Sequence, residues 1–440
     1  MSVETLLSDV LTVSRCSILL VMSKTTLSAE LAWRGFTKQT TYPSTTAIDG
    51  DPITFYFGVD PSAASMTIGN LASVMMVRQF IRHGHKAIIL IGGATGMIGD
   101  PDGKSTERNL KTLEEIDANK KGIVGQYNTL FKGFEFKVVD NYDWFKDMNY
   151  LTFLRDIGKH VPMRQMLGRD FVSSRLDADG DGISYAEFSY VLIQAYDFLH
   201  LSREHGASLQ LCGSDQWGNS IAGVDLIRRI TGQEAHVWSI PLVVNKTTGI
   251  KFGKSEDGAV WLEPNLTSPY KFYQFWLNLD DAGAVDYLKV YTDLTEEEIS
   301  EISTSFSADT SSRLAQKTLA YEVTKIVHGE QTADSVRHVS EVLFGSSSFA
   351  ELNGSDFEVL KSELGVVTAK PSDDLVEILC AAELASSKSE ARRFLESNAI
   401  YVNGSQLPLE KTTLDTTDAI AGHAVLRRGK NAQKIVEFQA

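Results

Sequence analysis

The sequence is poor in cysteine, in long apolar runs and in positive charge. Its three cysteines, Cys16, Cys212 and Cys380, lie too far apart for a disulfide framework or a Cys-x-x-Cys zinc site. They indicate a reducing compartment, and we expect a cytoplasmic protein. Apolar runs such as Ile18–Met22 and Ala87–Ile91 are far shorter than the ~20 residues that cross a bilayer, so we expect no membrane-spanning helix.

The excess of acidic side chains argues against a non-specific coat for nucleic acid. The 440 residues include 42 Lys and Arg against 57 Asp and Glu, a net charge of −15. A local basic patch could still bind RNA. Hydrophobic residues at 43% and charged residues at 22% are typical of a globular protein. The length predicts about three domains.

The first residues do not resemble a targeting segment. Glu4 and Asp9 precede the apolar run Ile18–Met22, and no clear small-residue cleavage site follows. We interpret this segment as a non-functional extension, with Met22 as an alternative start.

A strand, a helix and a second strand are predicted between residues 55 and 91. Phe55–Val59 is a short β-prone run, an apolar helical face follows from about Gly69, and His83-Gly84 ends it. Ala87–Ile91 reads as a buried strand. This βαβ unit predicts a parallel sheet, in which ligands bind at the carboxyl ends of strands.

Composition also divides the rest of the chain. Residues from about 267 to 343 have helical periodicity without strand signals, residues 344–370 are rich in Ser and Gly, and a small separate domain follows. We predict five segments: an N-terminal extension 1–26, a parallel-sheet domain 27–266, a helical domain 267–345, a linker 346–371 and a C-terminal domain 372–440.

The segment GVDPSAASMTIGNL, residues 58–71, is a candidate anion site. Thr67 and Asn70 flank Gly69 where a helix begins, and free backbone N–H groups there would face an anion. A simple helix cap explains the same residues equally well.

A second glycine-rich segment, residues 92–108, is not a known phosphate loop. Only three residues separate Gly99 from Gly103-Lys104-Ser105, so the Walker A spacing fails, and the spacing of its other glycines does not fit a dinucleotide fingerprint. A flexible loop carrying Asp100, Lys104 and Arg108 remains, with a surface turn as the alternative.

Three polar residues share one face of a predicted helix over 188–198. Tyr190, Gln194 and Asp197 lie at i, i+4 and i+7 among apolar neighbours. Buried polar groups need partners, so they bind either other protein groups or a polar ligand. The preceding residues 177–188 resemble a calcium loop, but Glu187 falls one position early, and we expect no protein-bound metal.

Two further segments carry candidate site residues. CGSDQWGN, residues 212–219, places Asp215 and Gln216 after a short strand, where they could also form a helix cap. KFGKS, residues 251–255, places Lys251 and Lys254 around a glycine, and two ammonium groups suit a polyphosphate.

The tail combines a helix–helix–strand pattern with clustered cations. Ser387 and Glu390 form a capping-box pattern, and Asn403-Gly404 predicts a hairpin turn. We expect RNA to bind the cations of this tail: Lys388, Arg392, Arg393, Arg427 and Arg428. A solvated charged face is the alternative.

Taken together and in this order, these segments resemble those of class I aminoacyl-tRNA synthetases, and specifically of the bacterial-type tyrosyl-tRNA synthetases. Residues 61–70 match the HIGH signature region and residues 251–255 the KMSKS loop. Thr67 and Asn70 stand where the family usually has His, although tryptophanyl enzymes also use Thr and Asn. The likeness runs from about Leu27 to Ala440.

The resemblance implies a role for each candidate residue. The residues implied to bind tyrosine are Tyr56, Asp60, Asp100, Tyr190, Gln194, Asp197 and Gln216. Those implied to bind ATP are Ser62, Gly69, Asp215 and Lys254. The catalytic groups implied around the phosphates are Thr67, Asn70, Lys104, Arg108, Lys251 and Lys254.

The fold implied is α/β: a Rossmann-like parallel-sheet catalytic domain, an α-helical domain and a small α+β RNA-binding domain. The activity implied is that of a homodimeric tyrosine–tRNA ligase that uses ATP with Mg²⁺, L-tyrosine and tRNA. A catalytically weakened RNA-binding relative and a tryptophanyl-tRNA ligase are the alternatives. Deleting residues 371–440 is expected to spare adenylate formation and cripple tRNA charging.

Overall fold

The computed structural model describes residues 25–101, 111–167, 172, 182–250, 252, 254–255, 258–344, 347–429 and 432–439. The chain divides into two compact units, Met1–Phe252 and Gly253–Ala440. Within the described ranges, no helix combines the length and hydrophobicity that crossing a membrane requires. The extension predicted over 1–26 falls almost wholly outside these ranges.

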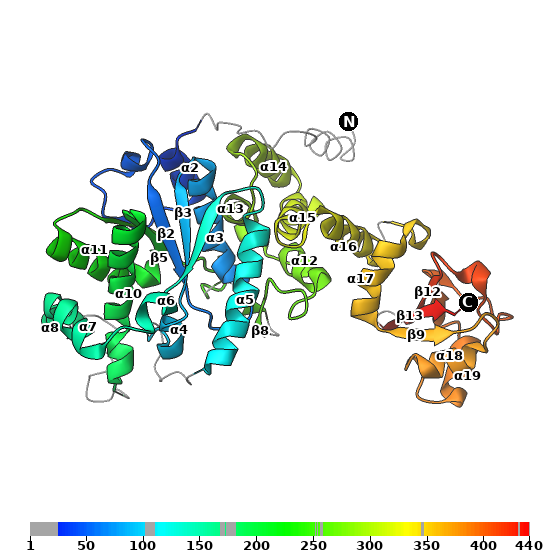
Figure 1. The fold of residues 1–440 in the computed structure, drawn as a ribbon. Helices are drawn as coiled ribbons and strands as arrows, with labels where there is room; N and C mark the ends of the chain where they lie inside the picture. The colour runs from blue at the N-terminus through cyan, green and yellow to red at the C-terminus, as the bar shows by residue number, and fades with distance from the viewer. Residues whose placement is uncertain are drawn as a thin grey trace. The chain divides into compact units, whose positions relative to one another are not determined.

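The first unit is built on a mostly parallel sheet (Figure 1), in the strand order β1-β6-β5-β2-β3-β4. Its strands are β1 (Gln39–Thr40), β2 (Thr54–Val59), β3 (Lys86–Ile91), β4 (Phe136–Asp140), β5 (Leu209–Gly213) and β6 (His236–Ile240). The edge strand β1 pairs antiparallel with β6, and the other pairs are parallel. The strand order reverses between β2 and β5, where such sheets bind ligands.

Helices cover both faces of this sheet, with α3 and α5 on one side and α10 and α11 on the other (Figure 1). The helical segments of the unit are α2 (Leu27–Arg34), η1 (Thr45–Ile48), α3 (Ile68–Arg82), α4 (Thr95–Ile98), α5 (Leu113–Leu130), α6 (Tyr142–Phe145), α7 (Tyr150–Asp156), η2 (Gly158–His160), α8 (Met163–Leu167), α10 (Tyr185–His205), η3 (Ser214–Gln216) and α11 (Trp217–Thr231). The predicted unit of strand, helix and strand is confirmed as β2, α3 and β3.

The second unit begins with the hairpin β7 (Lys254–Ser255) and β8 (Gly258–Ala259) and continues with helices. These are α12 (Pro269–Leu277), α13 (Asp281–Tyr291), α14 (Glu296–Ala308), η4 (Thr310–Ser312), α15 (Leu314–His328) and α16 (Glu330–Leu343). The prediction that residues 267–343 are helical is therefore confirmed.

The predicted linker 346–371 is wrong where the structure describes it. This segment contains η5 (Phe349–Glu351), α17 (Gly354–Leu364) and the strand β9 (Val366–Ala369). The small and polar residues that suggested a loop are helix caps: Ser348 caps η5 and Asn353 caps α17. Gly365, at φ 73°, ends α17.

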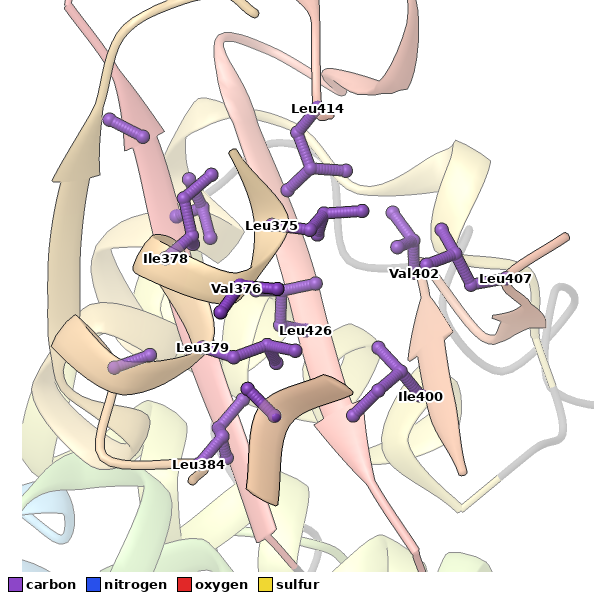
Figure 2. Close-up of a cluster of buried hydrophobic side chains, with 14 of the residues drawn as sticks. Leu375, Val376, Ile378, Leu379, Leu384, Ile400, Val402, Leu407, Leu414 and Leu426 are labelled. Carbon is purple, nitrogen blue, oxygen red and sulfur yellow. The ribbon is translucent and has the colours of Figure 1, made fainter. Parts of the chain in front are cut away.

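The C-terminal sheet has the order β11-β10-β12-β13-β9. Its remaining elements are α18 (Leu375–Ala381), α19 (Lys388–Glu396), β10 (Ile400–Val402), β11 (Ser405–Gln406), η6 (Thr416–Asp418), β12 (His423–Arg428) and β13 (Ala432–Phe438). Figure 2 shows Leu375 and Leu379 of α18 beside Leu426 and Ile400 of the sheet. The helix–helix–strand prediction is confirmed, and so is the turn, since Asn403 and Gly404 both have positive φ.

The two faces of this sheet are covered by different elements. Val425 and Ile435 alternate with the residues that face α18, and they pack with Phe357 and Leu360 of α17. The supposed linker thus supplies both an edge strand and a covering helix to the C-terminal domain.

Candidate active site

Four loops with polar residues meet at the carboxyl edge of the parallel sheet. Asp60 follows β2, Gly92 follows β3, Asn141 follows β4, and Asp215 and Gln216 follow β5. The carboxyl ends of parallel strands share one edge, so the fold gathers residues that lie far apart in the sequence.

Asp197 lies on α10 as a buried acid with both oxygens hydrogen-bonded. Its exposed fraction is 2%. Trp144 donates its indole N–H to Oδ1 at 2.9 Å, and Asn141 donates Nδ2–H to Oδ2 at 3.1 Å. Of the two alternatives for the polar face of α10, protein partners are confirmed for Asp197.

A chain of hydrogen bonds runs from Asn141 to Tyr190. Asn141 also donates to the Thr95 hydroxyl at 3.1 Å, and that hydroxyl donates to Asp60 Oδ1 at 2.6 Å. The Tyr190 hydroxyl donates to Asp60 Oδ2 at 2.7 Å. Two acids, Asp60 and Asp197, are therefore held through one asparagine and one threonine.

Three buried polar atoms beside this network lack a hydrogen-bond partner in the described structure. They are the Tyr56 hydroxyl, Gln194 Oε1 and Gln210 Oε1. Gln194 lies one turn before Asp197 on α10, and Tyr56 is directly opposite Gln210 in the β2–β5 register. Because buried polar groups are normally paired, this arrangement favours a polar ligand as the missing partner.

The titration of these groups follows from burial. Burial raises the pKa of Asp197 well above its ordinary value, and the hydrogen bonds from Asn141 and Trp144 oppose that effect. Burial, followed by the charge of Asp197, raises the pKa of Tyr56, so its phenol stays protonated and can donate. Burial also raises the pKa of the Cys212 thiol to about 12, which excludes a thiolate nucleophile there.

The glycine-rich segment is packed against side chains at its start. A Cβ on Gly92 would overlap the side-chain oxygens of Asp60 and Thr95, and a Cβ on Gly93 would overlap Asp140. Both glycines are buried. The alternative of a surface turn is therefore wrong for the start of this loop, where glycine is needed for close approach.

The start of α3 has an internal hydrogen-bond pair. Asn70 Oδ1 accepts from the Thr67 backbone N–H and from the Thr67 hydroxyl, both at 2.9 Å. A Cβ on Gly69 would lie 3.2 Å from the carbonyl oxygen of Phe252, so two motifs distant in sequence meet here. A role for this segment in nucleotide binding stays a prediction.

The loop after β5 joins two predicted residues. Gln216 donates Nε2–H to Asp100 and accepts from Asn219 at 3.2 Å through Oε1. Asp215 is exposed and lies beside Gly213, whose absent Cβ would also meet Leu242. Ser62 is exposed, with its backbone N–H bonded to the Asp60 carbonyl oxygen at 2.8 Å.

Several predicted residues lie outside the described part of the chain. Lys104, Arg108 and Lys251 are among them, as are the calcium-like residues 177–181 and the side chain of Lys254.

Sequence reasoning missed three residues of this network, Thr95, Asn141 and Trp144, and also Gln210 beside it. Two of them carried a usable signal. Asn141 directly follows the β-prone residues of β4, and Gln210 interrupts an apolar strand with a buried amide, 3% exposed. Trp144 carried none, because its partner Asp197 lies 53 residues away.

The cations of the C-terminal domain differ in whether they have an acidic partner. Lys388 forms an ion pair with Glu377, and Arg393 Nη2 lies 3.4 Å from Glu390. Arg392 is exposed and has no ion pair within the described residues. Ser387 caps α19, but Glu390 bonds Ser386 instead of Ser387, so only half of the predicted capping box forms.

Two arginines of β12 are held by aromatic rings. The Arg427 guanidinium lies 3.9 Å from the ring centroid of Tyr401, and it donates to the Gly429 carbonyl oxygen. Arg428 lies over Phe394 at 5.1 Å and donates to the Leu384 carbonyl oxygen at 2.8 Å. These two are less available to a partner than Arg392.

Several large apolar side chains on α7, α8 and at the start of α10 are exposed. We call this set the α7–α10 patch; its members are Tyr150 (58% exposed), Leu151 (72%), Met163 (57%), Leu167 (43%) and Tyr185 (61%). The Tyr150 and Tyr185 hydroxyl oxygens lie 3.1 Å apart. Large exposed apolar groups are candidates for a protein interface.

Comparison with known families gives two matches along the chain. Residues 49–345 match the family described as tRNA synthetases class I (W and Y). Residues 356–436 match the family described as tyrosine–tRNA ligase SYY-like C-terminal domain.

Individual relatives agree with these matches. Proteins named tyrosine–tRNA ligase from Staphylococcus haemolyticus and Geobacillus stearothermophilus are each 42% identical to the chain, over 94% of it and 99% of the relative. Among solved structures, a C-terminally truncated mitochondrial tyrosyl-tRNA synthetase from Aspergillus nidulans has a TM-score of 0.66 at 29% identity. That match covers 73% of this chain and 95% of the other.

Proposed function

The chain belongs to the class I tRNA synthetases of the tryptophan and tyrosine group, and we propose that it is a tyrosine–tRNA ligase. It would activate L-tyrosine with ATP and transfer the tyrosyl group to the 3′ end of its tRNA. The observation that carries this proposal is Asp197, a buried acid held by Asn141 and Trp144, together with the Tyr56 hydroxyl, which has no hydrogen-bond partner among the described residues.

Asp197 and Tyr56 would bind the phenol hydroxyl of the substrate. Burial raises the pKa of Tyr56, so its hydroxyl is protonated and can donate a hydrogen bond to the phenol oxygen of the substrate. Asp197 can accept a hydrogen bond from the phenol O–H. A site built to bond a hydroxyl rejects an analogue without one, since its own buried groups would be left unpaired. The site should therefore reject phenylalanine.

The ammonium group of tyrosine would lie at the other end of the pocket. Gln194 offers a buried oxygen that has no hydrogen-bond partner in the described part of the chain. Tyr190 would act with it, and Asp60 holds the Tyr190 hydroxyl in place at 2.7 Å. Asp100 and Gln216, already bonded to each other, would close this end.

ATP would lie beside this pocket, against the start of α3. The free N–H groups and the positive dipole end of this helix favour phosphate. Ser62, Thr67, Gly69 and Asn70 would border the phosphates, and Asp215 the ribose. Lys104, Arg108, Lys251 and Lys254 would supply positive charge to the leaving pyrophosphate.

The chemistry needs positioning more than proton transfer. The tyrosine carboxylate is already ionised, so it attacks the α-phosphorus directly as the bond to pyrophosphate breaks. A tRNA ribose hydroxyl then attacks the tyrosyl carbonyl carbon, and AMP leaves. Mg²⁺ would enter with ATP and neutralise part of the phosphate charge.

The C-terminal domain would bind tRNA through its cations. Arg392 is the most available of the five that the sequence predicts, because the others have acidic, aromatic or carbonyl partners. Phosphate groups of RNA attract such exposed cations in a salt-dependent way.

The α7–α10 patch would join two copies of the chain. Its exposed tyrosines and aliphatic groups suit a dimer core. The double variant Leu151→Asp/Tyr185→Asp should sediment as a monomer where the wild type sediments as a dimer. A wild-type protein that is already monomeric would contradict this part of the proposal.

We also propose a cytoplasmic location. Cys212 and Cys380 are free thiols, which agrees with a reducing compartment.

ATP–pyrophosphate exchange with tyrosine, tryptophan or phenylalanine as the substrate tests the central proposal. Exchange with tyrosine alone supports it. Exchange with tryptophan instead would make the chain a tryptophanyl enzyme, and no exchange together with tight tRNA binding would make it an RNA-binding relative.

A further inference from the structure

Helix α5 contacts the loop that leads into α3. Asn119 donates Nδ2–H to the Pro61 carbonyl oxygen at 2.9 Å. Gln126 makes two bonds: its Oε1 accepts from the Met66 backbone N–H, and its Nε2 donates to the Ser65 hydroxyl, both at 2.8 Å. Both ends of the segment 61–66 are therefore tied to one helix.

Between these two side chains, α5 approaches the loop with no side chain at all. A Cβ on Gly122 would overlap the carbonyl oxygen of Ala64. Glycine is unfavourable inside a helix, so its place here needs a reason, and this close approach supplies one. Positions 119, 122 and 126 follow helical spacing and share one face of α5.

The same helix is firmly fixed to the sheet. Ile116, Ile123 and Tyr127 are buried. Lys120 Nζ binds Asp140 Oδ2 at 2.9 Å, and Asp140 Oδ1 accepts from the Gly93 N–H at 3.1 Å. Helix α5 thus supports the glycine loop after β3 as well as segment 61–66.

Segment 61–66 has little structure of its own. Ser62 N–H bonds back to Asp60, while Met66 N–H relies on Gln126. The segment connects Asp60, which contacts the tyrosine pocket, with Thr67, which begins α3. A shift of this segment would move the start of α3 relative to Asp60.

We propose that Asn119, Gly122 and Gln126 are positioning residues that hold segment 61–66, and with it the start of α3, in the place that ATP phosphates require. The proposal rests on the ligase function proposed above. In this role the three residues act through residues 61–66, which they contact, and not by binding a substrate themselves.

The first test is exchange kinetics in Asn119→Ala and Gln126→Ala. The KM for ATP should rise about tenfold, the effect of losing a hydrogen bond to a fixed group, while the KM for tyrosine changes less than about twofold. Gln126→Glu keeps the acceptor for Met66 N–H and should restore most of the affinity. Asn128→Ala, on an exposed position of the same helix, is the matched control and should resemble the wild type.

Gly122→Ala tests the close approach. A methyl group there must displace the Ala64 carbonyl, so the KM for ATP should rise at least as much as in Gln126→Ala. If this variant fails to fold, Asn119→Ala and Gln126→Ala decide the question. An unchanged KM for ATP in both would overturn the proposal.

A second measurement separates this proposal from the function on which it rests. Amide hydrogen exchange at Met66 should accelerate about tenfold or more in Gln126→Ala, and not in Asn128→Ala. No acceleration overturns the positioning role, whatever the enzyme does. A wild type without exchange activity, but with acceleration in the variant, would sink the ligase proposal and leave the structural support intact.

Discussion

The proposed tyrosine pocket of the first unit is built around a buried acid, whereas the cationic surface of the second unit is built from exposed side chains. In the pocket, Asp197 is buried and each of its oxygens already has a donor. On the C-terminal surface, Arg392 and Arg393 are exposed, and Arg393 lies 3.4 Å from Glu390 and 5.5 Å from the ring centroid of Phe394. A buried acid that two donors hold in place gives discrimination, because a substrate without a hydroxyl leaves the remaining acceptor capacity of the acid unused and the buried Tyr56 hydroxyl unpaired. Exposed cations give affinity that salt can screen.

The largest effect should follow from Asp197→Ala. Removing the acid leaves the donors of Asn141 and Trp144 unpaired and the substrate phenol without an acceptor. We expect kcat/KM for tyrosine in ATP–pyrophosphate exchange to fall by about 10³, close to 4 kcal/mol. The KM for ATP should change little.

Adenylate formation at the wild-type rate by Asp197→Ala would contradict the role given to this acid. Phenylalanine exchange provides the control, since a substrate without a phenol hydroxyl gains nothing from Asp197. Its already low rate should change much less than that of tyrosine.

The second effect concerns the cations. Arg392→Gln should raise the KM for tRNA in aminoacylation about tenfold, as for the loss of one or two phosphate contacts. Arg427→Gln should raise it less than about threefold, because its guanidinium is already stacked on Tyr401. Adenylate formation should be unchanged in both, and both effects should shrink at high salt. Equal effects of the two substitutions would contradict the ranking.

Point substitutions test the RNA role better than the deletion of residues 371–440. That deletion removes β13, the parallel partner of β9, and exposes Phe357 and Leu360 of α17. A loss of charging could then reflect damage to the preceding helices.

The third effect is that of Tyr56→Phe. Its hydroxyl has no partner in the described structure, so the folded enzyme loses no bond when it is removed. We expect the KM for tyrosine to rise about fivefold and Tm to stay within about 1 °C of the wild type. A clear fall in Tm would show that the hydroxyl has a structural partner instead of a ligand.

The sequence predicts the fold well because its signals are local. The apolar run of β3 and the helical faces of α3 and α10 each lie within a few residues, and all three elements are found. The site was harder to predict. The triplet Tyr190, Gln194 and Asp197 follows from helical spacing, but the partners of Asp197 come from the end of β4, more than 50 residues away.

The error over 346–371 has a different cause. Ser348, Asn353 and Gly365 are residues of loops and also of helix ends, and composition alone does not separate the two uses. Val366 and Val367, which pair with β13, were the local signal for a strand.

The smallest effect tests whether ionisation of Asp197 lowers the stability of the fold. An exposed cation such as Arg392 should have no such effect. Burial raises the pKa of Asp197, so the folded protein holds this proton more tightly than the unfolded chain does. Its contribution to stability is therefore full below the ordinary aspartate pKa and is lost as the pH rises through the folded-state value. Asp197→Asn cannot ionise, so the Tm of this variant minus the Tm of the wild type should increase from pH 4 to pH 8. The increase should be about 2 °C for each kcal/mol that ionisation of Asp197 costs the folded wild type. Arg392→Gln should show no such trend. A Tm difference that stays flat in Asp197→Asn would mean that the bonds from Asn141 and Trp144 outweigh burial, and that the acid is ionised at little cost to the fold.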